Sequence, residues 1–162
     1  DDSINVDLAP FVTKTFENII MAKVSSNAVD AKKLGYLRSS DLMSMNQDFL
    51  LYDAKQDIIR LEKDMGTSIA NKRYRVGGES LLATLKYNLY QLYRGGFITE
   101  YDKHIAEKIA TVLCGGNALS GSFVSEQDLL DLEKEAFISL CGEEKTQQRI
   151  ENMLKTGKVL RN

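Results

Sequence analysis

The chain has 162 residues, of which 43% are hydrophobic and 27% charged, so it can form one compact globular domain and is not a disordered tail. Its formal net charge of −2 excludes a general attraction to nucleic acid or to an anionic membrane. The apolar runs fall far short of the ~20 residues that a membrane span needs. We therefore expect no membrane span, no nucleic-acid partner and a cytoplasmic location.

A single proline and glycines placed between periodic segments predict an all-α fold, an irregular bundle of six to seven helices that includes an αα-hairpin. The first helix should follow a cap at Asp7, carry Pro10 in its first turn and end near Lys23. It should carry Phe11, Thr15 and Ile19 on one face, with Phe16 and Ile20 beside them.

A short second helix should begin after Ser26 or Asn27 and stop at Gly35, and residues 36–46 should connect it to a long helix. Asn46 can cap that long helix, which is expected over residues 47–66. Its buried side is predicted to consist of Phe49, Tyr52, Ile58, Ile59 and Leu61.

Residues 66–78 are polar and basic and predict a loop, after which the segments 79–96 and 99–116 each end in Gly-Gly. These two segments predict an antiparallel αα-hairpin, with Thr99 and Asp102 at the start of its second helix. Tyrosines three residues apart on its first helix are expected in core or helix contacts: Tyr87, Tyr90 and Tyr93.

The last pair of helices is predicted over residues 126–141 and 144–156. Ser125 and Asp128 resemble a capping box with Asp in place of Glu or Gln. No run of alternating residues is left for strands, so a sheet of three or more strands is not expected.

Few residues suggest catalysis. His104 is the only histidine, which rules out a two-histidine metal site within this chain, and its charged helix face predicts a solvated side chain. Most acidic residues lie next to Lys or Arg and are expected to form ion-paired surfaces. Cys114 and Cys141 have neither metal-ligand nor disulfide spacing and are expected as buried free thiols. A helix start after Gly78 could hold an anion, but no predicted strand precedes it, so a dinucleotide fingerprint is not supported.

Two segments resemble the enoyl-CoA hydratases of the crotonase superfamily: "AKVSSNAVDAKKLGYLR" (22–38) and "EKEAFISLCGEEKTQQRIENMLKTGK" (133–158). The ending "MLKTGKVLRN" is most similar to the bifunctional enzymes of fatty-acid β-oxidation, in which a 3-hydroxyacyl-CoA dehydrogenase part precedes the hydratase part. The resemblance implies three segments: 1–65 resembling the crotonase C-terminal region, a helical hairpin insertion over 66–124, and a terminal helix pair over 125–162.

The resemblance further implies a C-terminal helical piece that supports core packing and oligomerisation, with no catalytic residue or complete active site of its own. The family's oxyanion hole and catalytic glutamates would precede Ala22. The parent would hydrate a trans-2-enoyl-CoA and oxidise the product with NAD, so NAD and the CoA thioester belong to the parent and no cofactor is expected in this chain. The expected partners are the rest of the parent enzyme, acyl-CoA and a second copy in a homo-oligomer.

The family's last helix contacts the CoA 3′-phosphate and adenine. Its closing aromatic falls on Met153, and of its closing cations only Lys158 remains, with Lys155 and Arg161 as substitutes. The predicted CoA-binding residues are therefore Lys158, Lys155, Arg161 and Met153, unless the tail is only a solvated basic segment. Two alternatives stay open: a free-standing helical protein–protein interaction module, and an all-α enzyme that uses surface carboxylates. As a piece of a larger enzyme, the chain should expose apolar surface on the helices of residues 8–60 and form a symmetric dimer.

Overall fold

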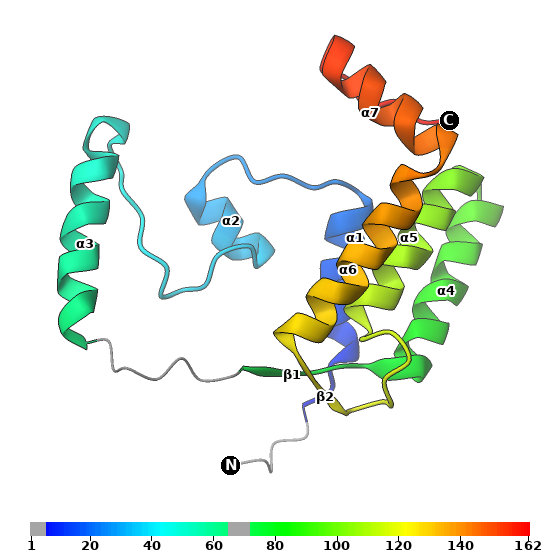
Figure 1. Cartoon of the computed structure of the whole chain (residues 1–162), viewed down its shortest axis with the longest axis horizontal. Coiled ribbons are helices and arrows are strands. Elements are labelled where there is room, and N and C mark those ends of the chain that lie inside the picture. Colours follow the sequence, from blue (N-terminus) through cyan, green and yellow to red (C-terminus); the bar gives the residue numbers. More distant parts are fainter. Residues whose placement is uncertain (1–5, 65–71) are drawn as a thin grey trace. The chain divides into compact units, whose positions relative to one another are not determined.

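The computed structural model of the chain describes residues 6–64 and 72–162 (Figure 1). Its contacts divide it into two compact units: unit 1 comprises Asp1–Lys23 and Lys72–Asn162, and unit 2 comprises Val24–Asn71. The segments expected at 1–65, 66–124 and 125–162 rest on resemblance rather than on packing, and they stay a prediction. Residues 65–71, within the expected loop and the end of the long helix, lie outside the described residues.

Unit 1 is helical apart from one short ribbon. Its elements are α1 (Ala9–Ile20), β1 (Arg73–Arg75), α4 (Gly78–Arg94), α5 (Glu100–Leu113), β2 (Phe123–Ser125), α6 (Glu126–Cys141) and α7 (Glu144–Thr156). Unit 2 contains α2 (Ala28–Leu34), the 3-10 turn η1 (Gln47–Phe49) and α3 (Leu50–Asp64). The described ranges thus hold seven α-helices and one two-stranded sheet, which confirms the all-α prediction. None of the helices in these ranges is long and apolar enough to cross a membrane.

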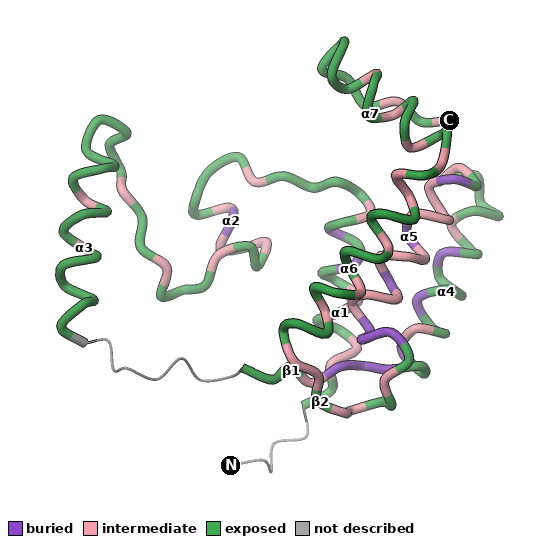
Figure 2. Tube along the Cα trace, viewed as in Figure 1, coloured by how far each residue is buried: buried purple, intermediate pink, exposed green. Residues whose placement is uncertain are grey.

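The core of unit 1 lies between α4, α5 and α1 (Figure 2). Residues spaced by four on each helix of the hairpin form one buried stripe, and α1 adds one aromatic ring: Leu81, Leu85, Leu89, Ala106, Ala110, Cys114 and Phe16. Alanines opposite leucines allow α4 and α5 to approach closely, and each buried leucine contributes about 1.5–3 kcal/mol. The predicted αα-hairpin is confirmed. Burial raises the pKa of the Cys114 thiol to about 11, so this cysteine is inert at neutral pH, whereas Cys141 is only partly buried.

The predicted packing of α1 and α4 is confirmed only in part. Tyr87, Tyr90 and Tyr93 are exposed and lie outside the core, since the leucine stripe of α4 takes the contact with α5. Tyr93 still makes one contact between the helices, because the Lys103 ammonium of α5 lies over its ring at 5.8 Å. On α1, Phe16 is 2% exposed and Ile20 packs against the core, whereas Phe11 and Ile19 are exposed, so the helix turns inward the side of Phe16 and Ile20 rather than that of Phe11 and Ile19. The helix also ends at Ile20 rather than near Lys23, and its N-cap residue is Leu8 rather than Asp7. The Asp7 carboxylate still accepts the Ala9 N–H at 3.0 Å.

Local capping signals fix the ends of the hairpin and of α6. Thr99 with Asp102, and Ser125 with Asp128, form complete capping boxes, as predicted. The turn into α4 needs glycine at position 78, where φ is +61° and a Cβ atom would lie 2.4 Å from the Ser120 nitrogen. The loop before β2 therefore packs directly on the backbone at the start of α4.

The β1–β2 ribbon was not predicted, because three-residue strands are too short to show alternation. The strands are antiparallel, with Tyr74 opposite Val124. Two further backbone bonds extend the pairing, from the Val76 N–H to Ser122 O (3.0 Å) and from the Gly121 N–H to Val76 O (2.9 Å). This ribbon pairs the segment that precedes α4 with the segment that precedes α6.

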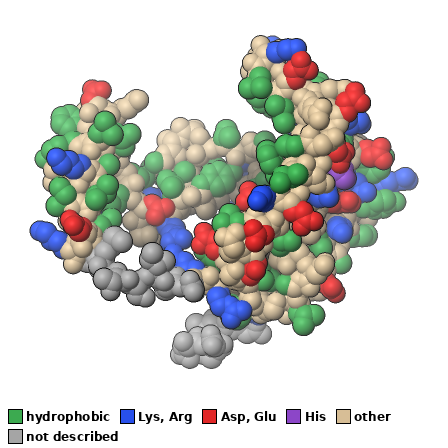
Figure 3. Space-filling model, viewed as in Figure 1, with side chains coloured by type: hydrophobic (Ala, Val, Ile, Leu, Met, Phe, Trp, Pro, Cys, Tyr) green, Lys and Arg blue, Asp and Glu red, His purple; other side chains and the backbone are tan. Residues whose placement is uncertain are grey.

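Unit 2 keeps the predicted ends of its short helix, whereas the long helix begins at Leu50 after a 3-10 turn and its predicted buried side is not observed. Asn27 accepts the Asp30 N–H and caps α2, Gly35 ends it with φ +84°, and Asn46 caps η1 ahead of α3. The predicted buried side of the long helix was wrong, since all five of its residues are exposed: Phe49, Tyr52, Ile58, Ile59 and Leu61. Ala31 is the one buried residue among those described in unit 2. The expected exposed apolar surface on the helices of residues 8–60 is therefore present (Figure 3).

Candidate functional site

The basic tail predicted to contact CoA follows α7 and folds back beside it. Gly157, at φ +67°, ends α7, and the Asn152 side chain donates to the Lys158 carbonyl at 2.6 Å. Asn162 donates to the Lys145 carbonyl (3.3 Å) and to Gln148 Oε1 (2.9 Å), so the last residue returns to the first turns of α7. The tail is thus held at both ends.

Asp102 on α5 joins the tail and α7 to the hairpin. Its carboxylate lies 2.8 Å from Arg149 on α7 and 3.2 Å from Arg161 in the tail. Arg149 Nε also donates to Asn162 Oδ1 at 2.8 Å. Burial acts to raise the pKa of Asp102, but hydrogen bonds from Arg149 and Thr99 outweigh it and hold the pKa below its ordinary value of 3.8. A carboxylate that is ionised at neutral pH therefore binds two guanidinium groups.

These contacts change the expected roles of the predicted cations. Arg161 is engaged with Asp102, and Lys155 forms an ion pair with Glu151 one turn earlier on α7. Lys158 has no ion pair within the described part of the chain. Met153 is an exposed residue of α7. The structure therefore brings Arg161 to α5 rather than to a shared cation cluster, and a contact between these four residues and CoA stays a prediction.

A second group of contacts joins α5 to the start of α7, and sequence reasoning missed it. His104 Nε2 lies 2.9 Å from Glu143 Oε1, and its ring stacks on Tyr101 with centroids 5.8 Å apart. The Tyr101 hydroxyl meets Thr146 Oγ1 at 2.7 Å, and the Arg149 guanidinium lies over the Tyr101 ring at 5.0 Å. His104 is thus half-exposed and paired rather than freely solvated, with a partner 39 residues away that no local pattern indicates.

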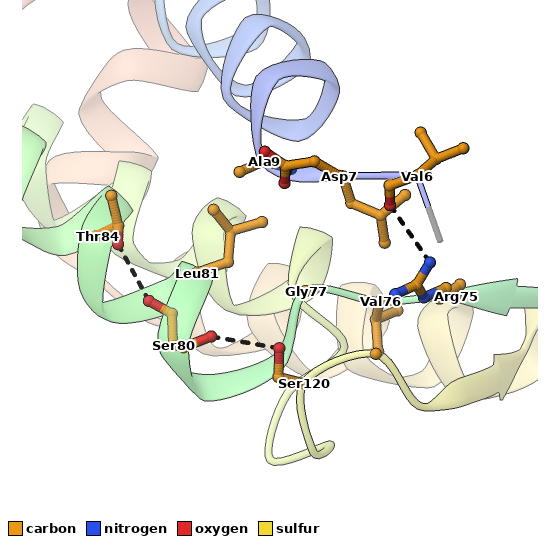
Figure 4. Close-up of a pocket in the computed structure, with 12 residues that line it drawn as sticks. Val6, Asp7, Ala9, Arg75, Val76, Gly77, Ser80, Leu81, Thr84 and Ser120 are labelled. Atoms are coloured by element: carbon orange, nitrogen blue, oxygen red, sulfur yellow. Dashed lines mark hydrogen bonds between the residues drawn. The ribbon is translucent and has the colours of Figure 1, made fainter. Parts of the chain in front are cut away.

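A polar pocket of about 460 Å³ lies at the start of α4 (Figure 4). Ser80 and Thr84 come from the first turns of α4, Ser120 from the loop before β2, and Arg75 from β1. The Ser80 hydroxyl meets that of Ser120 at 3.3 Å, Thr84 donates to the Ser80 carbonyl at 3.1 Å, and Arg75 donates to the Val6 carbonyl at 3.3 Å. This is the helix start that the sequence marked as a possible anion site, and the hydroxyl groups of Ser80, Thr84 and Ser120 are hydrogen-bonded within it.

An apolar groove of about 540 Å³ runs between α5 and α6. Its walls are isoleucine, valine and leucine from α5 and leucine and phenylalanine from α6, with Ile19 of α1 at its margin. Hydrophobic side chains are visible at the surface along α6 (Figure 3), and none of the residues of α6 is buried. No group of His, Cys, Asp and Glu residues in the described ranges could hold a metal ion. The surface of unit 1 thus offers an apolar groove and a polar pocket.

One comparison with known proteins gives a homologous segment. The chain is 44% identical over 149 residues to a "Probable 3-hydroxyacyl-CoA dehydrogenase" of Bacillus subtilis (strain 168). The match covers 92% of this chain and 19% of that relative, so the chain spans about a fifth of the length of the protein it matches. No family model matches the chain, and no solved structure matches it. The relative's name supports the dehydrogenase part of the resemblance and does not mention a hydratase, which stays a prediction.

Proposed function

We propose that this chain is a helical, non-catalytic segment of a 3-hydroxyacyl-CoA dehydrogenase, and that the complete enzyme also carries an enoyl-CoA hydratase part. The observation that carries the proposal is the 44% identity over 149 residues to a dehydrogenase about five times longer than the match. Identity at this level across nearly the whole chain supports a common fold and a common place within a larger enzyme. The complete enzyme would act in the cytoplasm, hydrating a trans-2-enoyl-CoA and oxidising the product with NAD.

The contacts of the tail suggest what this segment contributes. Arg149 and Arg161 both bind Asp102, so the tail is fixed on the α4–α5 hairpin, the most deeply packed part of unit 1. The Lys158 ammonium is left to meet an anion from outside the described residues. We propose that this anion is the 3′-phosphate of CoA, because an ammonium supplies a compact point charge that suits phosphate. NAD would be bound by the dehydrogenase part and not by this segment.

Assays of the complete gene product test the proposal. Purified enzyme should reduce NAD with a 3-hydroxyacyl-CoA and should hydrate a trans-2-enoyl-CoA. Dehydrogenase activity without hydratase activity would remove the hydratase part of the proposal. The absence of both activities would overturn it and favour the alternative, a free-standing interaction module, for which the exposed groove between α5 and α6 is the supporting observation.

The role of Lys158 has a separate test in the same enzyme. Lys158→Ala should raise KM for the enoyl-CoA by about tenfold and leave kcat nearly unchanged, because the phosphate is remote from the reacting carbons and is bound equally in ground and transition states. Lys86→Ala, at an exposed position of α4, is the matched control and should leave both constants unchanged. An unchanged KM in Lys158→Ala would make the tail a solvated segment without a ligand.

A further inference from the structure

The apolar groove between α5 and α6 has the features of a self-complementary surface. A two-fold dimer uses one patch twice, so that patch must carry both a protruding group and the recess that receives it. Phe137 lines the groove and is 64% exposed, and Leu130 lies two turns earlier on the same side of α6. These exposed apolar side chains form a surface patch, and such patches mark interaction sites.

The groove residues of α6 form one seam along the helix. They are Glu126, Leu129, Leu130, Glu133, Ala136, Phe137 and Leu140. Glu126, Leu130, Glu133 and Phe137 are the exposed ones and recur at intervals of three or four residues, as in a helix that packs along its length on another helix. α6 begins with a complete capping box at Ser125 and Asp128, so the seam does not depend on a partner for its helical form.

Charge is distributed unequally along the groove. Glu126 lies at the first residue of α6, at the amino-terminal end of the seam. Lys108 lies at the other end, where its ammonium donates to Ser139 Oγ at 3.3 Å. An antiparallel partner with the same sequence would place its cationic end on this acidic end and its acidic end on this cationic end. The helix dipoles would also be antiparallel, which is their favourable arrangement.

We infer that a second copy of this chain occupies the groove, as a two-fold dimer in which the two α6 helices pack antiparallel and cross near Glu133. In this arrangement Leu130 of one protomer packs against Phe137 of its partner, and Glu126 of one protomer approaches Lys108 of its partner. Glu133 lies near the axis, where Lys134 of the other protomer flanks the seam and can neutralise it. The inference does not depend on the enzymatic proposal, since it uses only the groove and its charges.

Sedimentation equilibrium of the purified chain over a wide concentration range tests this dimer. The unmodified chain should be dimeric, and Phe137→Glu should be monomeric, because it places a carboxylate in an apolar seam twice per dimer. Two matched controls carry the same change at exposed positions outside the groove and should stay dimeric: Leu154→Glu on α7 and Phe49→Glu in unit 2. Circular dichroism should show unchanged helix content in all three variants.

A charge exchange tests the orientation. Glu126→Lys and Lys108→Glu should each raise the dimer dissociation constant about tenfold, because each creates two like-charge contacts per dimer. The double variant should return it to within about threefold of the original value. A chain that stays monomeric, a dimer insensitive to Phe137→Glu, a dimer dissociated by Phe49→Glu, or a double variant without recovery would each overturn the inference.

Discussion

Unit 1 and unit 2 both form regular helices, but they differ in what stabilises them. Unit 1 buries a contiguous stripe from α4 and α5 with Phe16 of α1. Unit 2, over its described residues, buries one alanine, and the apolar residues of α3 face water. The difference shows that the sequence features that make a segment helical do not by themselves determine whether its apolar face is buried.

The helices of unit 2 are stabilised mainly by the capping residues at their ends. Asn27 and Gly35 cap the seven residues of α2, and Asn46 precedes η1 and α3. A polar cap contributes about 0.5–2 kcal/mol, whereas an isolated helix of this length is marginal in water. Unit 2 should therefore open locally far more easily than unit 1.

Matched truncations should give the largest difference between the units. Leu85 is 0% exposed and Ile58 is 67% exposed. Leu85→Ala should lower the free energy of unfolding by about 2–5 kcal/mol, because it removes buried methyl groups and leaves a cavity. Ile58→Ala should change it by less than about 0.5 kcal/mol. Urea denaturation followed by circular dichroism measures both, and equal losses would contradict the contrast.

Glycine substitutions should give the next largest difference. At Gly78 an alanine would meet both a left-handed backbone and the Ser120 nitrogen, so Gly78→Ala should cost about 2–4 kcal/mol. At Gly35, with φ +84° and open space around it, Gly35→Ala should cost only about 1 kcal/mol. Thermal and urea unfolding of the two variants provide the measurement. A larger loss at Gly35 would mean that unit 2 is the more tightly packed region.

Replacement of Asp102 should have a smaller effect that depends on pH. Asp102→Asn should cost about 1–3 kcal/mol at neutral pH, because it removes the charge that Arg149 and Arg161 share. Since the folded pKa of Asp102 is lowered, its contribution is present above the ordinary pKa of 3.8 and is lost as the pH falls through the folded value. The gap between the two proteins should therefore close in acid. Asp57→Asn, which removes an exposed pair with Arg60 in unit 2, should change stability by less than about 0.5 kcal/mol at either pH.

Local features of the fold could be predicted from the sequence. The capping boxes at Thr99 and Ser125 involve residues three apart, and both were recognised. The cap of α2 was narrowed to Ser26 or Asn27, and the structure has Asn27. The environment of α3 was not recognised, because an apolar stripe shows that a helix has an apolar side but not which neighbour covers it. The β1–β2 ribbon was missed for a similar reason, since its partners lie about fifty residues apart and each strand has three residues.

The candidate site shows the same limit. The sequence identifies Lys155, Lys158 and Arg161 as cations near one end of the chain. It does not indicate that Arg161 pairs with Asp102, 59 residues earlier, or that Arg149 binds the same carboxylate from 47 residues away. The pairing of His104 with Glu143 was likewise outside the reach of local patterns. Ion pairs between distant segments depend on helix packing, which spacing alone does not specify.

Native-state amide hydrogen exchange tests most directly the claim that unit 1 is the cooperative body of this chain. The amides of α4 around Leu85 and of α5 around Ala110 should exchange slowest, with a common free energy equal to that of global unfolding. The amides of α3 should exchange at least about a hundredfold faster, through local opening. Equal protection in α3 and α4 would contradict the account, because it would require unit 2 to share the stability of a core that it does not form.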